Sequence, residues 1–297
     1  MIAGKRARII VRLSLLLLSV QLPAHSQTTP GNTNSGAAAT PKAPAIPTIS
    51  TSRPSFTDTG TTVPQGSLQA ESGATYTNNR DKTYSWTVPE TLLRLGLTDN
   101  TEFRFTVPDY TYIGDSQPGH IVSNFGDISV GFSHHIAAPR KIDVALVPML
   151  NLPTGAIKAS SNSVDPQFRL VVVKPIGKWT ISSHLDTRWF TGHNAPEEVL
   201  FNITSITYYD FPGKWNGFLE YSGFIPTTGR TTQFLGVGAL FVPTPRQQFD
   251  ARITAGLNNT SPDVLVGFGY SFRIDGLFGK SRDYATFPKM RRRRSNP

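Results

Sequence analysis

The sequence of 297 residues contains no cysteine, which excludes disulfide bonds, thiol catalysis, cysteine-ligated metals and a lipoprotein anchor. Charged residues are also scarce, at 16% of the chain against a usual value of about 25%. No apolar run reaches the roughly 20 residues that a membrane-spanning helix needs. Any part of this chain that crosses a membrane must therefore be built from β-strands.

Acidic charge is lacking only at the two ends of the chain. Of the 29 basic residues, four lie within the first 12 positions and seven follow Asp275, which leaves 18 basic and 19 acidic residues in 27–275. The central part is therefore about neutral, although the formal net charge is +9. The basic ends alone do not indicate nucleic-acid binding, and we predict no nucleic-acid partner.

The first 26 residues have the three parts of a secretory signal peptide. A basic start precedes a short apolar run, Leu13–Val20, and the small residues Ala24-His25-Ser26 precede a cleavage site near Gln27. The next residues are mostly Thr, Pro, Ala, Ser and Gly, a composition that cannot bury enough apolar surface to fold. We therefore predict a signal peptide (1–26), a disordered periplasmic leader (27–65), a folded body (66–275) and a basic tail (276–297).

Apolar and polar residues alternate strictly in the last part of the folded body. From Val264 to Ile274 every second residue is apolar or aromatic, and the residues between them are mainly Gly, Ser and Arg. Alternation with a period of two indicates β-strands, because successive side chains point to opposite faces. A run of about 11 residues also has the length of a tilted strand that crosses a bilayer.

The same pattern recurs twelve times after Gly66. The connections are alternately tight, as at 98–100 and 211–213, and longer, as at 113–125 and 153–165. An even number of antiparallel strands with this alternation is the plan of a bacterial outer-membrane barrel. A soluble sandwich has alternating strands too, but no reason for alternating connections. We predict an all-β fold, a single antiparallel transmembrane β-barrel of about 12 strands, near 67–77, 84–97, 101–112, 126–136, 141–152, 166–175, 178–190, 199–210, 214–224, 232–242, 247–257 and 264–274.

The polar faces of these strands carry both signs of charge, which is typical of the lumen of such a barrel. Asp127 is either part of a conducting constriction or the start of a strand, and we favour the strand start. Aromatic residues such as Trp86, Trp179 and Trp215 lie near strand ends, where interfacial girdles belong. The predicted lumen-lining residues are Glu71, Arg94, Glu102, Arg104, Asp127, Arg169, Asp186, Arg188, Glu220, Asp250, Arg252 and Arg273.

Several segments resemble the transporter-like outer-membrane family named for the meta-pathway of phenol degradation. They are RPSFTDTGTTVPQGSLQAESG at 53–73, PETLLRLGLTDNTEFRF at 89–105, FGDISVGF at 125–132, LPTG at 152–155 and FGYSFR at 268–273. The resemblance implies an outer-membrane barrel that passes small, often hydrophobic molecules. It supplies no binding residues, and the basic tail departs from barrels that end on an aromatic residue.

We therefore expect a non-enzymatic transporter or porin-like barrel in the bacterial outer membrane, without cofactor or metal. Its expected partners are outer-membrane lipid, the barrel assembly machinery and a small permeant. A closed structural or binding barrel is the first alternative. A membrane-embedded hydrolase is the second, because Ser182, His184 and Asp186 share one face of a strand. Residues two apart on a strand lie about 7 Å from each other, too far for direct hydrogen bonding, so we favour a polar lumen.

Overall fold

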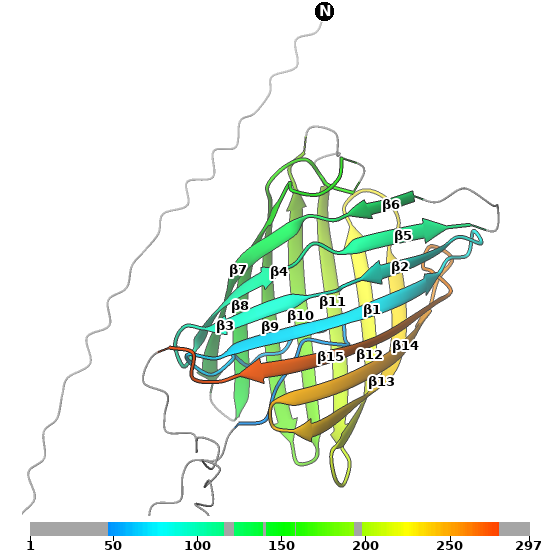
Figure 1. Cartoon of the computed structure of the whole chain (residues 1–297). Helices are drawn as coiled ribbons and strands as arrows, with labels where there is room; N and C mark the ends of the chain where they lie inside the picture. The colour runs from blue at the N-terminus through cyan, green and yellow to red at the C-terminus, as the bar shows by residue number, and fades with distance from the viewer. Residues whose placement is uncertain (1–46, 116–121, 139–140, 158, 193–197, 279–297) are drawn as a thin grey trace, which may run out of the picture. The chain divides into compact units, whose positions relative to one another are not determined.

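The structure, a computed structural model, describes residues 47–115, 122–138, 141–157, 159–192 and 198–278 (Figure 1). Every regular element in these ranges is a β-strand. Within the same ranges, no helix combines the length and the apolar character of a membrane span. The predicted signal peptide, residues 27–46 of the predicted leader and residues 279–297 of the tail lie outside the described residues.

Fifteen strands form one antiparallel sheet. Their bounds are β1 Leu68–Asn78, β2 Tyr84–Val88, β3 Leu92–Gly96, β4 Thr101–Thr106, β5 Tyr110–Gly114, β6 Val122–Phe125, β7 Ile128–Ala138, β8 Ile142–Leu152, β9 Asp165–Ile176, β10 Trp179–Phe190, β11 Glu198–Asp210, β12 Trp215–Pro226, β13 Thr232–Thr244, β14 Gln247–Gly256 and β15 Val264–Ile274.

The sheet closes on itself, because β1 pairs with β15 along its whole length, from Leu68 opposite Ile274 to Asn78 opposite Val264. Three neighbouring wall strands are each interrupted, so β2 and β3, β4 and β5, and β6 and β7 are the two parts of one strand. The wall is therefore a closed barrel of twelve antiparallel strands, which confirms the predicted fold class.

The interruptions occur at 89–91, 107–109 and 126–127, where proline and short loops replace the regular ladder. Pro89 and Pro108 have no backbone N–H to donate across the sheet. Single hydrogen bonds still cross the breaks, for example from Val107 N to Thr91 O at 2.9 Å and from Gly126 N to Asp109 O at 2.8 Å. The wall is thus weaker here than between the continuous strands.

Side chains alternate between the two faces of the wall as the sequence predicts. Phe249 and Ile253 of β14 are 49% and 52% exposed, whereas Asp250 and Arg252 between them are buried. An apolar outer face and a polar inner face are what a barrel in lipid requires. In this strand Gln248, Asp250, Arg252 and Thr254 all point inward and are buried.

One part of the inner face is apolar. Ala145, Val147 and Val171 are fully buried and pack together on β8 and β9, and Phe218 of β12 also points inward. The run Val171–Val173 and the position of Phe218 do not fit a purely polar lumen, because apolar side chains lie among the charged ones on the inner face.

The two ends of the barrel differ in their connections. One end, here named the turn end, carries the short connections 97–100, 177–178, 211–214 and 245–246, and the opposite end, the loop end, carries longer ones such as 257–263. Gly177 and Gly213 have φ angles of 62° and 89°, a region that favours glycine in tight hairpin turns. In outer-membrane barrels the short turns face the periplasm.

Candidate functional site

Residues 47–64, here named the luminal segment, run inside the barrel. Thr57 and Asp58 are 2% and 3% exposed, and their partners lie on strands from opposite sides of the wall. The segment enters and leaves at the turn end, since Pro47 O accepts a bond from Arg273 and Gly66 O accepts one from Leu277. It is therefore a loop folded back into the lumen.

The segment differs from the prediction of a disordered leader up to residue 65. It has no strand pairing, so its backbone groups are satisfied mainly by side chains. Ser55 Oγ donates to Thr57 O at 2.8 Å, and Thr51 Oγ1 donates to Arg53 O at 2.8 Å. Bonds of this kind, together with those from the wall, order a stretch whose large apolar residues are only Ile49, Phe56 and Val63.

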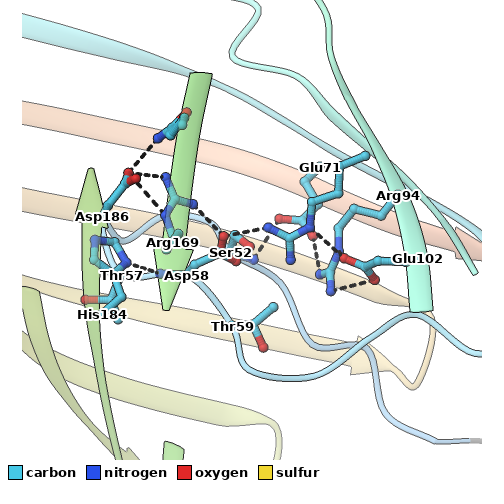
Figure 2. Close-up of polar contacts among 12 residues, drawn as sticks. Ser52, Thr57, Asp58, Thr59, Glu71, Arg94, Glu102, Arg169, His184 and Asp186 are labelled. Atoms are coloured by element: carbon cyan, nitrogen blue, oxygen red, sulfur yellow. Dashed lines mark hydrogen bonds and ion pairs between the residues drawn. The ribbon is translucent and has the colours of Figure 1, made fainter. Parts of the chain in front are cut away.

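Asp58 is the centre of the contacts between the segment and the wall (Figure 2). Its Oδ2 accepts hydrogen bonds from Arg104 Nη1 and Arg169 Nη1, both at 2.5 Å, and its Oδ1 accepts one from Ser52 Oγ at 2.5 Å. The Asp58 backbone N–H donates to His184 Nδ1 at 3.2 Å. The Asp58 carboxylate thus links β4 and β9, and the Asp58 backbone N–H adds β10.

A row of alternating charges continues on β1, β3 and β4. Arg94 donates to Glu71 at 2.8 Å and to Glu102 at 2.8 Å, and Glu102 also accepts from Arg104 at 2.7 Å. All four side chains are at most 2% exposed. Each buried charge therefore has an opposite charge in contact, which offsets the cost of removing it from water.

The same row holds the backbone of the luminal segment. Arg94 Nη1 donates to Ser50 O at 2.9 Å and its Nη2 donates to Thr61 O at 2.7 Å, so one guanidinium binds both limbs of the loop. Glu102 Oε2 accepts from Val63 N at 2.7 Å, and Glu71 Oε2 accepts from Ser52 N at 2.8 Å. The wall charges thus dock the segment.

The tip of the loop is held on the opposite side of the barrel. Glu220 of β12 accepts from the backbone N–H groups of Phe56 and Thr57 at 3.1 and 2.7 Å. The Phe56 ring packs against Phe224 and Phe234 at 5.4 and 5.7 Å, with the Arg252 guanidinium 4.4 Å above it. The tip is thus held by the packed Phe56 ring and by the Glu220 carboxylate, which accepts two backbone hydrogen bonds.

Arg53 lies in a seat made by two glycines that oppose each other on β1 and β15. A Cβ atom on Gly73 would lie 2.1 Å from Arg53 Nη2, and one on Gly269 would lie 2.5 Å from Arg53 Nε. From this seat Arg53 reaches Glu90 at 2.7 Å and Phe268 O at 3.0 Å. The absence of side chains at these glycines is therefore required for the contact.

The segment separates cavities inside the barrel. A cavity of about 280 Å³ at the turn end is lined by Ile49, Gly60, Val173, Tyr208 and Leu240, among others. A cavity of about 220 Å³, nearer the loop end, is bounded by Arg53, Phe56, Glu90, Asp109 and Arg169. A small solute has room on either side, and the luminal segment stands between the two spaces.

Most of the predicted lumen residues are buried on the inner face and contact the luminal segment or one another. Their role in permeation stays a prediction. Arg169 bonds to Asp186 at 2.8 Å, and Arg188 Nη2 donates to Gln167 Oε1 at 3.2 Å. Asp250 forms an ion pair with Arg53 of the luminal segment at 3.7 Å. The residues within the set that hydrogen-bond to the segment are Glu71, Arg94, Glu102, Arg104, Arg169, Glu220 and Arg273.

Two predicted residues hold connections at opposite ends of the barrel. Asp127 lies between β6 and β7 and accepts from Asn151, the Gly155 N–H and Ser160 at 2.8, 2.8 and 3.0 Å, so it orders the loop that follows β8. At the turn end, Arg273 and Arg246 both bond to Asp275 at 2.7 Å. Burial raises the pKa of the Asp275 carboxyl, but the bonds from Arg273 and Arg246 outweigh burial and hold the pKa below its ordinary value of 3.8.

The group Ser182, His184 and Asp186 does not form a hydrogen-bonded triad. His184 uses one ring nitrogen for Asn202 Oδ1 at 2.7 Å and the other for the Asp58 N–H. Asp186 accepts from Gln167 and Arg169 instead. Among the described residues, no group of three or more His, Asp or Glu side chains could hold a metal ion.

The comparison with protein families matches the sequence model described as "Putative MetA-pathway of phenol degradation" to residues 51–274. The chain belongs to this family. The match confirms the predicted resemblance and begins within the luminal segment, so this phenol-degradation family includes the segment as well as the strands. No curated protein matches the chain.

Solved structures of outer-membrane barrels are similar to this family member. The COG4313 outer membrane channel from Pseudomonas putida F1 has a TM-score of 0.59 and 14% identity, and the alignment covers 72% of this chain and 97% of that one. The KdgM porin has a TM-score of 0.44 and 9% identity, with 69% and 98% covered. The first of these likenesses supports the fold of an outer-membrane channel.

Proposed function

We propose that the protein is a channel of the bacterial outer membrane that passes small molecules without catalysis, and that the luminal segment must move for a solute to pass. The observation that carries the proposal is the position of this segment between two cavities of the lumen. Hydrogen bonds and ion pairs hold it, and a polar solute or water can replace such bonds. The barrel wall stays closed while the segment moves.

The outer-membrane location is tested by fractionation. The protein is expected in the outer membrane, and it should migrate faster on a gel when unheated than when boiled, because a closed barrel resists detergent. Recovery in the soluble periplasm with unshifted migration would contradict the location.

Charged and apolar side chains that lie next to each other in the lumen suit small aromatic molecules that carry a polar group. Arg169 of β9 is directly opposite Val147 of β8, so its guanidinium lies beside the apolar patch of Ala145, Val147 and Val171. Gly60 of the segment covers this patch, since a Cβ there would lie 2.5 Å from Val173 Cγ2. A solute that displaces the segment would thus meet apolar and charged partners together.

A disulfide lock tests whether the segment must move. Thr57 Oγ1 donates to Thr204 Oγ1 at 2.7 Å, so cysteines at these two positions are close enough to join. The chain has no other cysteine, so the pair would be specific. Oxidised Thr57→Cys/Thr204→Cys protein in liposomes should pass no small aromatic acid, and reduction should restore passage.

The two single-cysteine variants are the matched controls, because they lose the same hydroxyl groups but cannot form the bond. Their passage should not depend on the reductant. Equal passage by the oxidised and reduced double variant would show that the segment need not move. An absence of passage in every form, including one that lacks residues 47–64, would leave a closed structural barrel as the function.

A second route is favoured by the three interrupted wall strands. An apolar solute could leave the lumen sideways into the bilayer where single bonds, such as Val107 N to Thr91 O, replace the continuous ladder. A cysteine pair at Thr91 and Val107 would close this gap when oxidised. The lock should stop uptake of a neutral aromatic and leave ion conductance unchanged. Equal uptake with and without the lock would exclude the lateral route.

A further inference from the structure

The outer face of the barrel has a groove at the turn end, over β10 to β13. Its volume is about 630 Å³, and its walls include Trp179, Phe211, Trp215 and Leu219, which are 50%, 51%, 52% and 52% exposed. Side chains of this size project into the surroundings of the barrel rather than into the lumen. The groove is therefore open to whatever surrounds the wall.

Small residues form the floor of the groove. Gly217 of β12 opposes Ala239 of β13, and Ala239 in turn opposes Ala251 of β14. The next outward-facing positions along β12 toward either end are the large residues Trp215 and Leu219. The result is an apolar trench between Trp215 and Leu219, in which the Phe211 ring lies over Gly217, 2.9 Å from where a Cβ would be, and Ala239 is exposed.

A repeated tripeptide marks the end of this trench. The β9–β10 turn contains Gly177-Lys178-Trp179, and the β11–β12 turn contains Gly213-Lys214-Trp215. In both, glycine has a positive φ angle, lysine is exposed and tryptophan forms part of the groove. The acidic residue nearest to these turns in the chain, Asp210, instead lines the inner cavity. The groove thus has two cations at its mouth.

We propose that this groove binds an anionic phospholipid of the periplasmic leaflet, with one acyl chain in the trench and the phosphate at Lys178 and Lys214. Lys214 Nζ donates one bond to Pro243 O at 2.6 Å, which leaves two of its three donors for a phosphate. Tryptophan at this level is suited to the interface between headgroups and acyl chains. The charge of the site favours an anionic headgroup over a zwitterionic one.

Tryptophan fluorescence can measure this binding. Two of the four tryptophans line the groove, whereas Trp86 and Trp189 lie on other parts of the wall. In phosphatidylcholine nanodiscs that hold the full chain, brominated phosphatidylglycerol at low mole fraction should quench the emission more strongly than brominated phosphatidylcholine. The preference should disappear in Trp179→Phe/Trp215→Phe.

Charge and shape are then separated by variants. Each lysine near a membrane surface contributes about fivefold to the binding of an anionic lipid, so Lys178→Gln/Lys214→Gln should lower the preference about 25-fold. Lys141→Gln, at another turn of the same end, is the matched control and should leave it unchanged. Ala239→Phe fills the trench and should weaken binding although both lysines remain. Unheated gel migration shows which variants have folded.

Equal quenching by the two brominated lipids would overturn the proposal, since the lipid would then be only part of the general bilayer. An equal loss in Lys141→Gln would show a non-specific charge effect and overturn it as well. A dimer that Ala239→Phe disrupts, without any preference for phosphatidylglycerol, would assign the groove to a second copy of the chain. The result does not depend on whether the lumen conducts, so it is separate from the test of transport.

Discussion

Replacing Asp58 with asparagine should release the luminal segment while leaving the barrel folded. The Asp58 side chain is 1% exposed and contacts Arg104 and Arg169, whose side chains are 2% and 23% exposed. Breaking a buried ion pair by removing one partner costs about 3 to 5 kcal/mol. Arg104 retains Glu102 and Arg169 retains Asp186, so we expect the lower value, about 3 kcal/mol.

A cost of about 3 kcal/mol shifts the equilibrium between docked and released segment about 150-fold toward release. Single-channel recording in a planar bilayer should show this as a larger open probability. Asp127→Asn is the matched control, because it removes a carboxylate that contacts Asn151 and Ser160 instead of the segment.

A variant without residues 47–64 shows whether Asp58 is what holds the luminal segment. It should conduct at least as well as Asp58→Asn. If deletion raises conductance and Asp58→Asn does not, Asp58 is not what holds the segment. If neither change raises conductance, the segment does not control the lumen at all.

Three further changes test other parts of the structure. Val266→Arg should impair membrane insertion by about 2 to 4 kcal/mol, because Val266 faces outward. Gly267 faces inward, so Gly267→Ser should insert normally. If the two variants show the same fraction of heat-shifted protein on the gel, the two faces are assigned wrongly. Gly73→Ala should displace Arg53 and raise open probability, and Gly126→Ala, whose Cβ would have its nearest neighbour at 3.6 Å, should not. Because the pKa of Asp275 is lowered in the folded state, its ionised carboxylate stabilises the fold above pH 3.8, and this stabilisation is lost as the pH falls below that value. The melting temperatures of wild type and Asp275→Asn should therefore differ at neutral pH and converge in acid. A difference that does not change with pH would show that the Asp275 carboxylate does not stabilise the fold.

The strands could be predicted from the sequence because their pattern has a local cause. Lipid on one side and polar groups on the other impose a period of two on every strand, and the last hairpin shows it plainly. The predicted 264–274 strand is the observed β15, and the predicted 84–97 strand is observed as β2 and β3 with a break at Pro89.

The luminal segment could not be predicted in the same way. Its composition is that of a flexible leader, and its order depends on partners far away in the chain, such as Arg53 with Phe268 O, 215 residues apart. The signal that could have found it was the family resemblance at 53–73, which starts before the first strand. The inward positions of Val171 and Phe218 follow from the period of two, since they lie two residues from Arg169 and Glu220, but the packing of an apolar inner patch depends on how the lumen is filled.

The luminal segment is tethered at both ends to the same mouth of the barrel, through Pro47 and Gly66. A loop of this kind can leave the lumen through the same mouth by which it entered. No free chain end then has to pass through the pore. A pull from the N-terminal side would load the bond between Pro47 and Arg273 first and the contacts of Thr51, Asp58 and Phe56 afterwards. The bonds would then break one after another, as in unzipping, and each step would need far less force than shearing the whole set at once.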